Sequence, residues 1–140
     1  MEKYRYLKDL TSDVMFEAFG KDEKELFENA AEAMFGVVAK IDQIEPKEKL
    51  EFEFKGDDLF HALFNFLNNS IAEAEIAEMF LCKFDVKLEK TSGGYMGKVA
   101  AWGEPISPEK GETVVKAVTL YKFSVEKTKD GFRAVVVCDI

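Results

Sequence analysis

The sequence predicts an α/β protein of the α+β type, with two helices and a set of strands in a single domain over residues 1–140. Two segments in the first half repeat apolar residues at helical spacing, and the second half reads as a series of strands. No repeat, linker or low-complexity tract divides the chain. Hydrophobic residues make up 47% of the sequence and Phe occurs 13 times, which excludes the composition of a disordered chain.

The chain opens with strands and a helix. Aromatic and β-branched residues predict short strands over residues 3–6 and 13–20. A helix is expected over residues 21–40, because Asp22 and Glu25 form a capping-box pattern and apolar residues follow at helical spacing. This helix is expected to be amphipathic.

The middle of the chain continues with a strand and a second helix. Residues 50–55 alternate apolar and charged side chains, which is typical of a strand with one buried face. The second helix is expected over residues 56–67. Asp57 or Asp58 suits its N-cap, because a carboxylate oxygen there accepts hydrogen bonds from the unpaired amides of the first turn.

The second half is predicted to be β-structure, with strands near residues 80–90, 95–103, 113–126 and 132–139. Glycines separate the first two strands, and a Pro-bearing loop separates the second from the third. Asp130 and Gly131 give a hairpin signal before the last strand. That strand is an almost unbroken apolar run, so we expect it to be buried.

The charge of the chain limits its partners. The formal net charge is −8 at pH 7, so the field of the molecule repels phosphate backbones and anionic membrane surfaces. We therefore expect contact with RNA to be indirect. No apolar stretch approaches the roughly 20 residues of a membrane span, and the N-terminus has no apolar core of a signal peptide, so a cytoplasmic location without membrane contact is expected.

Few residues of the common catalytic and metal-binding kinds are present. His61 is the only histidine, which excludes multi-histidine metal sites, and its spacing from Asp58 and Asn65 predicts a position on the polar face of the second helix. Cys82 and Cys138 lie far apart in apolar runs and are interpreted as buried thiols, not as a zinc or redox pair. We therefore assign no catalytic residue from these patterns.

Oxygen-bearing side chains cluster near the start of the chain. Asp9 and Asp13 flank Thr11 and Ser12, a run whose oxygens suit calcium or magnesium. The run is not an EF-hand loop, because the required glycine and glutamate are missing. Taken alone, it is better explained as a turn in which these side chains bond their own backbone.

The end of the chain makes a cation site near Asp13 more plausible than a simple turn. The final strand places Asp139 beside the terminal carboxylate of Ile140. If this strand and the one after Asp13 share a sheet, three carboxylates converge. Like charges repel, so such a cluster is stable when a cation or a basic residue lies among them. Lys116 is a candidate basic member, and a solvent-facing strand lysine is the alternative interpretation of that residue.

Five segments together resemble one known family: YRYLKDLTSDV from residue 4, ELFENAAEAMFGVV from residue 25, GDDL from residue 56, GETVVKAVTLYKF from residue 111 and VVVCDI from residue 135. The chain resembles the archease family from end to end. The resemblance implies two helices packed on a mixed, mostly antiparallel β-sheet. It also implies a divalent cation near the opening and closing motifs, expected to be calcium, with magnesium or manganese as alternatives.

The resemblance further implies an accessory role in RNA ligation, as a protein cofactor of an RNA ligase and not as an enzyme. Archeases activate the RtcB-type RNA ligase, which uses GTP and manganese to join RNA ends in tRNA splicing and RNA repair, and they promote its guanylylation and turnover. The family residues carry over onto Asp13, Lys116 and Asp139 as the ligase-facing set. The cation ligands expected here are Asp13, Asp139 and Ile140.

The chain departs from the family pattern at three positions. The family usually has His where Leu10 stands and a Tyr-His pair where Leu120 and Tyr121 stand. A role for those family side chains is therefore absent or altered in this protein. The ligase-facing residues Asp13, Lys116 and Asp139 are all present.

Two functions of other classes stay open from the sequence. One is a metal-dependent phosphoester hydrolase that acts through a cation-bound water at the same carboxylates. The other is a general protein-binding or chaperone-like module. A phosphoester screen separates the first from an activator. Neutral substitution of Asp13 separates a general binding module from an activator, because the module should still bind its partners when Asp13 is replaced.

Overall fold

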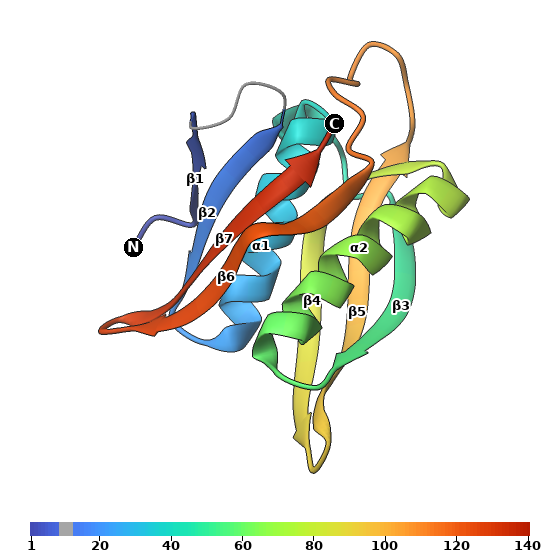
Figure 1. Ribbon diagram of the computed structural model, residues 1–140. Coiled ribbons are helices and arrows are strands. Elements are labelled where there is room, and N and C mark those ends of the chain that lie inside the picture. Colours follow the sequence, from blue (N-terminus) through green and yellow to red (C-terminus); the bar gives the residue numbers. More distant parts are fainter. Residues whose placement is uncertain (9–12) are drawn as a thin grey trace.

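The structure is a computed structural model that describes residues 1–8 and 13–140 (Figure 1). The elements follow in the order β1 (Tyr4–Leu7), β2 (Val14–Gly20), α1 (Glu23–Val38), the short 3-10 helix η1 (Ile41–Gln43), β3 (Glu48–Gly56), α2 (Leu59–Ala77), β4 (Met79–Thr91), β5 (Gly94–Pro105), β6 (Ala117–Thr128) and β7 (Gly131–Asp139). Each predicted helix and strand has a counterpart, and α2 extends well beyond its predicted end. The predicted α+β class is confirmed.

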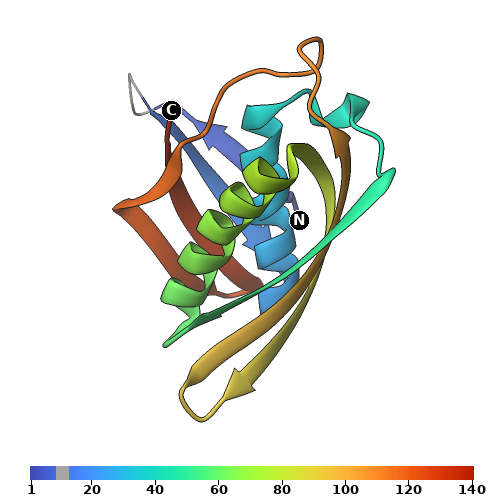
Figure 2. The same ribbon diagram turned by 90° about the vertical axis from the view of Figure 1, so that its right-hand side faces the viewer.

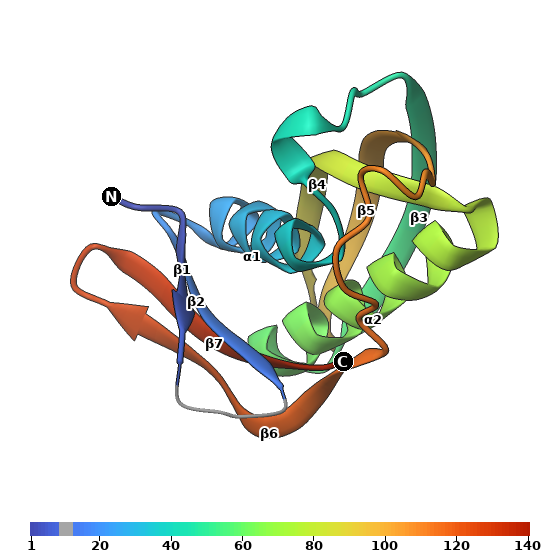
Figure 3. The same cartoon turned by 90° about the horizontal axis from the view of Figure 1, so that it is seen from above.

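The strands form two antiparallel sheets instead of one mixed sheet. Within the described residues, the first sheet has the order β1-β2-β7-β6 and the second has the order β3-β5-β4. Figure 2 and Figure 3 show both helices lying between the two sheets. Helix α1 contacts β2 and β4, and helix α2 contacts β3 and β6, so each helix has a sheet on both sides. A single sheet would leave one apolar side of each helix uncovered.

Aromatic side chains fill the space between the sheets. Phe27 of α1, Phe54 of β3 and Phe66 of α2 form a cluster with ring centroids 5.7, 5.6 and 5.0 Å apart. Ala30 and Ala31 are fully buried, and their small side chains let α1 pack closely against its neighbours. Burying each phenylalanine stabilises the fold by roughly 1.5–3 kcal/mol.

Both helices begin at predicted N-caps. Asp22 Oδ1 accepts a hydrogen bond from the Glu25 amide at 2.8 Å, and Glu25 Oε1 accepts one from the Lys21 amide at 3.1 Å. Of the two candidates for α2, Asp58 is the cap, and its carboxylate accepts from the His61 amide at 2.8 Å. That hydrogen bond, followed by one from the imidazole, lowers the pKa of Asp58. His61 is exposed, as predicted.

Side chains of the helices bond the backbone of three edge strands, namely β6 in the first sheet and β3 and β4 in the second. On edge strand β6, the Asn68 amide bonds both backbone groups of Val118: Oδ1 accepts from its N–H at 2.9 Å, and Nδ2 donates to its carbonyl at 3.2 Å. On edge strand β4, Glu28 accepts from the Val86 amide at 2.9 Å and Lys24 donates to the Val86 carbonyl at 3.0 Å. These four backbone groups, which have no partner on a neighbouring strand, are satisfied in this way.

The third edge strand, β3, is sealed by the other side of α2. Asn65 Nδ2 donates to the Lys55 carbonyl at 2.8 Å, and Asn69 Nδ2 donates to the Glu53 carbonyl at 3.2 Å. Helix α2 therefore bonds to an edge of each sheet, with Asn68 directed to β6 and the other two asparagines directed to β3.

One predicted strand boundary is wrong. Residues 113–126 were expected to form a strand, but β6 begins at Ala117, so Lys116 precedes the strand instead of lying within it. The physical reason is that the chain before Lys116 bonds to the end of α1 and not to a neighbouring strand. In the described part of the chain, neither helix is long and apolar enough to cross a membrane.

The twofold hydrogen bond of Asn68 gives a stability prediction. Asn68→Ala leaves the amide and carbonyl of Val118 without partners, so we expect the free energy of unfolding to fall by about 1–3 kcal/mol. Asn69→Ala is the matched control, because that side chain bonds a single carbonyl, and we expect a loss of about 1 kcal/mol or less. Urea unfolding at neutral pH measures both, and equal losses in the two variants would contradict the account.

Candidate functional site

The end of β7 lies in the middle of the first sheet, beside the start of β2. Strand β7 has β2 on one side and β6 on the other. Val14 pairs with Cys138 in the antiparallel register, so one further step places Asp13 beside Asp139. Figure 1 shows the start of β2 and the end of β7 at the same end of the sheet.

The same end of β7 is also held by the segment that leads into β6. Ala117 pairs with Asp139, and the Lys116 amide donates a hydrogen bond to the Asp139 carbonyl at 2.8 Å. The register therefore places Lys116 beside Ile140. Lys116 is exposed, and Ile140 is 37% exposed. We call Asp13, Lys116, Asp139 and Ile140 the acidic tip, because the strand registers bring these four predicted residues together.

The strand that carries the acidic tip is buried on both faces. Val136, Val137 and Cys138 are all fully buried, and successive side chains of a strand point to opposite faces. Asp139 follows directly and is half-buried. The predicted burial of the final strand is confirmed, and Asp139 therefore stands on a rigid element.

The Cys138 thiol, which lies next to the acidic tip, is unreactive. Burial, together with the negative charge of Asp13, raises the pKa of Cys138 to about 12. The thiol is therefore neutral at physiological pH and is neither a thiolate ligand nor a nucleophile. Cys82 is half-buried instead of fully buried, and burial raises its pKa as well.

The donors of the acidic tip are oxygens. Asp13 and Asp139 supply side-chain carboxylates, and Ile140 lies next to them. Over residues 1–8 and 13–140, no three or more Asp, Glu, His or Cys side chains gather as a metal-binding group. Carboxylate oxygens fit a hard cation of the calcium or magnesium class, whose coordination water molecules can complete. The predicted oxygen run at Asp9, Thr11 and Ser12, and the departure at Leu10, lie outside the described residues.

A segment that we call the strap, residues 106–116, runs over the end of α1 and into the acidic tip. The amides of Glu112 and Thr113 donate to the carbonyls of Val38 and Val37 at 2.9 and 3.2 Å. These carbonyls belong to the last turn of α1, which has no further helical amides to bond. The sequence predicted a loop in the first part of the strap, but not its attachment to α1.

A buried carboxylate fastens the strap. Lys110 Nζ donates to Glu104 Oε1 at 2.7 Å, and the same oxygen accepts from the Glu45 amide at 3.0 Å. Glu104 is 8% exposed. The hydrogen bond from Lys110 is the main cause that lowers the pKa of Glu104, so this carboxylate is ionised at neutral pH and holds the strap.

Two of the positions that depart from the family pattern lie in an irregular stretch of β6. The register of β6 against β7 shifts between Thr119 and Ser124, and Lys122 has a left-handed backbone with φ of 54°. Leu120 and Tyr121 lie within this shift and are 59% and 57% exposed. Both side chains are therefore accessible to a partner molecule.

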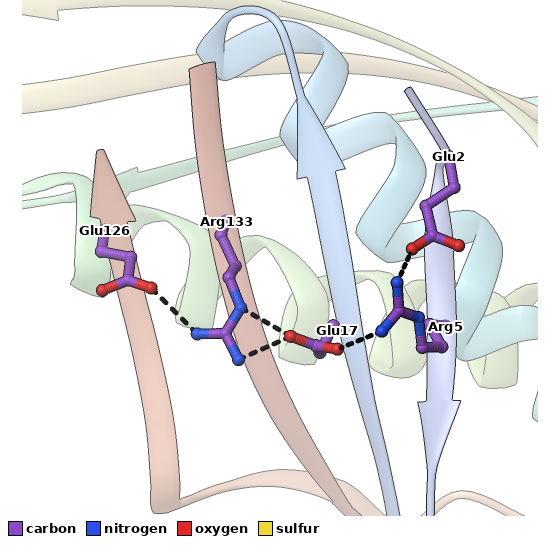
Figure 4. A network of polar contacts seen from close by, with 5 residues as sticks. All are labelled: Glu2, Arg5, Glu17, Glu126 and Arg133. Carbon is purple, nitrogen blue, oxygen red and sulfur yellow. Dashed lines mark hydrogen bonds and ion pairs between the residues drawn. The ribbon is translucent and has the colours of Figure 1, made fainter. Parts of the chain in front are cut away.

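A network of ion pairs ties the four strands of the first sheet together (Figure 4). Glu17 on β2 is nearly buried and accepts from Arg133 Nε of β7 at 2.6 Å. Arg5 of β1 lies 3.8 Å from the other oxygen of Glu17, and Arg133 also pairs with Glu126 of β6 at 2.9 Å. Arg5 further pairs with Glu2. The network links all four strands of the first sheet, and sequence reasoning missed it because the partners on different strands lie far apart in the chain.

Comparison with known proteins identifies the family. The model of the Archease protein family matches residues 4–140. The chain belongs to the archease family. Protein archease of Pyrococcus abyssi is 38% identical over 133 residues, which cover 93% of this chain and 94% of that protein. Protein archease of Methanosarcina acetivorans is 38% identical over 142 residues, with 99% and 97% covered.

Solved structures share the fold. The solution structure of Methanobacterium thermoautotrophicum protein 1598 matches with a TM-score of 0.87 and 29% identity, and the match covers 100% of both chains. The crystal structure of an archease from Thermotoga maritima, described as a possible chaperone, matches with a TM-score of 0.67 over 97% of each chain. At 21% identity, the second match shows the fold alone. The family resemblance predicted from the sequence motifs is confirmed.

Proposed function

We propose that this chain is an accessory activator of an RtcB-type RNA ligase, and that it places its acidic tip against the active site of that enzyme. The observation that carries the proposal is the register of β2, β6 and β7, which gathers Asp13, Lys116 and Asp139 on the end of a buried central strand. Membership of the archease family supports an accessory role, and the Thermotoga maritima protein is described as a possible chaperone.

The chemistry of the acidic tip suits a site where metal ions and nucleotide phosphates meet. Its carboxylates attract a divalent cation, and Lys116 supplies a positive charge that can pair with phosphate or carboxylate oxygens. A rigid strand end delivers these groups with little loss of conformational entropy on binding. In this proposal the tip promotes guanylylation and turnover of the ligase. The RNA is bound by the ligase, because the net charge of −8 disfavours phosphate contacts by this chain.

We propose that Asp13, Asp139 and the carboxylate of Ile140 hold a divalent cation of the calcium class. The cation would offset the mutual repulsion of the carboxylates and add a positive charge near the nucleotide. Lys116 cannot be a ligand while its amine is protonated, so its part is to pair with neighbouring anions.

The hydrolase alternative has less support from the structure. Such an enzyme commonly has a general base near its cation-bound water, and histidine is the most frequent one. His61 is the only histidine of the sequence and lies in the first turn of α2. Figure 1 places that end of α2 away from the end of β7. An activator needs no such base.

Cation binding is the first prediction of this proposal. Asp13→Asn and Asp139→Asn each remove one anionic ligand at nearly constant size, so each should weaken calcium binding at least about tenfold. Asp130→Asn, an exposed carboxylate in the β6–β7 hairpin, is the matched control and should bind as the wild type does. Titration calorimetry with calcium measures all three, and unchanged binding in both tip variants would remove Asp13 and Asp139 from the site.

Activation is the second prediction. Asp139→Asn and Lys116→Ala change charge with little loss of buried area, so both variants should keep the melting temperature within a few degrees of the wild type. Each should abolish the stimulation of multiple-turnover ligation by the cognate ligase, measured with limiting ligase, GTP and manganese. Lys129→Ala, which removes an exposed lysine from the β6–β7 hairpin, is the control.

The outcomes of the ligation assay separate two failures. Absence of stimulation by the wild-type chain would overturn the activator function itself. Normal stimulation by both tip variants would leave an activator whose working residues lie elsewhere.

A further inference from the structure

An apolar cavity lies beneath the strap. Its volume is about 490 Å³, it opens to solvent, and it is lined by the ends of α1 and α2, the start of β4 and the strap itself. Phe35, Ile71, Ala74, Met79 and Val114 supply much of its lining. This volume is within the range of pockets that bind small molecules or anchor side chains of a partner.

Two exposed apolar side chains form part of the wall of this cavity. Val114 and Ile106 belong to its lining and are 72% and 53% exposed. The amide of Ile106 donates to the carbonyl of Glu78, the C-cap of α2, at 3.0 Å, so the strap and the end of this helix lie side by side. Exposed apolar side chains at the wall of a cavity are typical of an interaction site.

The rim of the cavity is acidic. Glu75 and Glu112 are part of the lining and are exposed. Within residues 1–8 and 13–140, neither of these side chains has a salt-bridge partner, whereas nearby Lys110 is engaged by Glu104. The cavity thus combines an apolar interior with negative charge at its edge, which complements an apolar side chain flanked by basic residues.

The cavity is continuous with the acidic tip through the chain itself. The strap forms one wall of the cavity and ends at Lys116, whose amide bonds Asp139. A partner segment seated against the strap therefore lies directly beside the tip.

We propose that the cavity receives an apolar anchor side chain from a basic segment of the RNA ligase, and that this contact docks the acidic tip at the active site. The inference rests on the proposed function. An enzyme that binds RNA carries basic surface around its active site, because its affinity comes mainly from neutralising phosphates. An apolar side chain in a fitted pocket is the usual source of affinity at the centre of an interface. The contact supplies affinity, whereas the tip supplies activation.

The test is the affinity between the full chain and its cognate ligase, measured by titration calorimetry. Val114→Asp puts a charge on the exposed wall of the cavity, and Ala74→Phe fills the cavity from α2. Each should weaken binding by about tenfold or more. Val114 is exposed, so the Val114→Asp variant should fold normally, which thermal melting checks. Met96→Asp, at an exposed apolar residue of β5, is the matched control and should bind within about twofold of the wild type.

Charge at the rim is tested separately. The double variant Glu75→Lys with Glu112→Lys should weaken binding and reduce its salt dependence. Glu53→Lys with Glu89→Lys makes the same change of net charge on the second sheet and should have a much smaller effect. Equal effects of the two pairs would contradict an acidic rim that recognises a basic segment.

Each remaining outcome decides between the proposals. If the wild type stimulates the ligase while Val114→Asp and Ala74→Phe bind as tightly as the wild type, the docking inference fails and the activator function stands. If the wild type neither binds nor stimulates the ligase, both the docking inference and the activator function fail.

Sedimentation of the wild type as a dimer that Val114→Asp dissociates would assign the cavity to a second copy of the chain. An apolar small molecule retained in native mass spectra and displaced by Ala74→Phe would assign the cavity to that ligand. The dimer and the bound small molecule would each overturn docking of the ligase in this cavity.

Discussion

Strand β7 is buried on both faces and paired along both edges, and the geometry of the candidate site depends on this burial. Val136, Val137 and Cys138 are inaccessible to solvent, and β2 and β6 flank them. Burial of each large apolar side chain stabilises the fold by roughly 1.5–3 kcal/mol, so the strand cannot detach without losing several kcal/mol. Asp139 is consequently held in place before any partner or ion arrives, and so are the neighbours that its register brings to it.

The helices fill the core, and their side chains also bond the backbone of edge strands. Edge strands present unpaired amides and carbonyls that invite pairing with another chain. The described edges of β3, β4 and β6 each carry hydrogen bonds from side chains of a helix. Addition of a partner strand at these edges is therefore disfavoured. The acidic tip and the cavity beneath the strap are the surfaces proposed to meet a partner, and they adjoin each other through Lys116.

Part of this structure follows from local sequence, and part cannot. The caps at Asp22 and Asp58, the helical periodicity and the apolar run of β7 are local signals, and each is confirmed. The candidate residues Asp13 and Asp139 also stand out by their type and position in the sequence. Their proximity depends on the pairing of β2 with β7, which joins segments more than 110 residues apart. Local sequence holds little information of that kind.

The misjudged features share this origin. The division into two sheets results from two helices that need cover on both sides, which becomes visible only when all elements are packed together. Val114 and Val115 have high strand propensity, yet the strap that contains them bonds to the last turn of α1. Glu17 and Arg133 were not singled out because a surface ion pair and a nearly buried one look alike in sequence. In the division of the sheets and in the strap, tertiary contacts override local preference.

The central claim is that the acidic tip faces the active site of the ligase. The most direct measurement places a photo-reactive amino acid at position 116, irradiates the complex with the cognate ligase, and maps the crosslinked ligase peptides by mass spectrometry. Position 129, in the β6–β7 hairpin, serves as the comparison. The account predicts crosslinks from position 116 to the peptides that bind GTP and manganese, and few crosslinks from position 129. Crosslinks from position 116 to a ligase surface remote from those peptides would contradict the account.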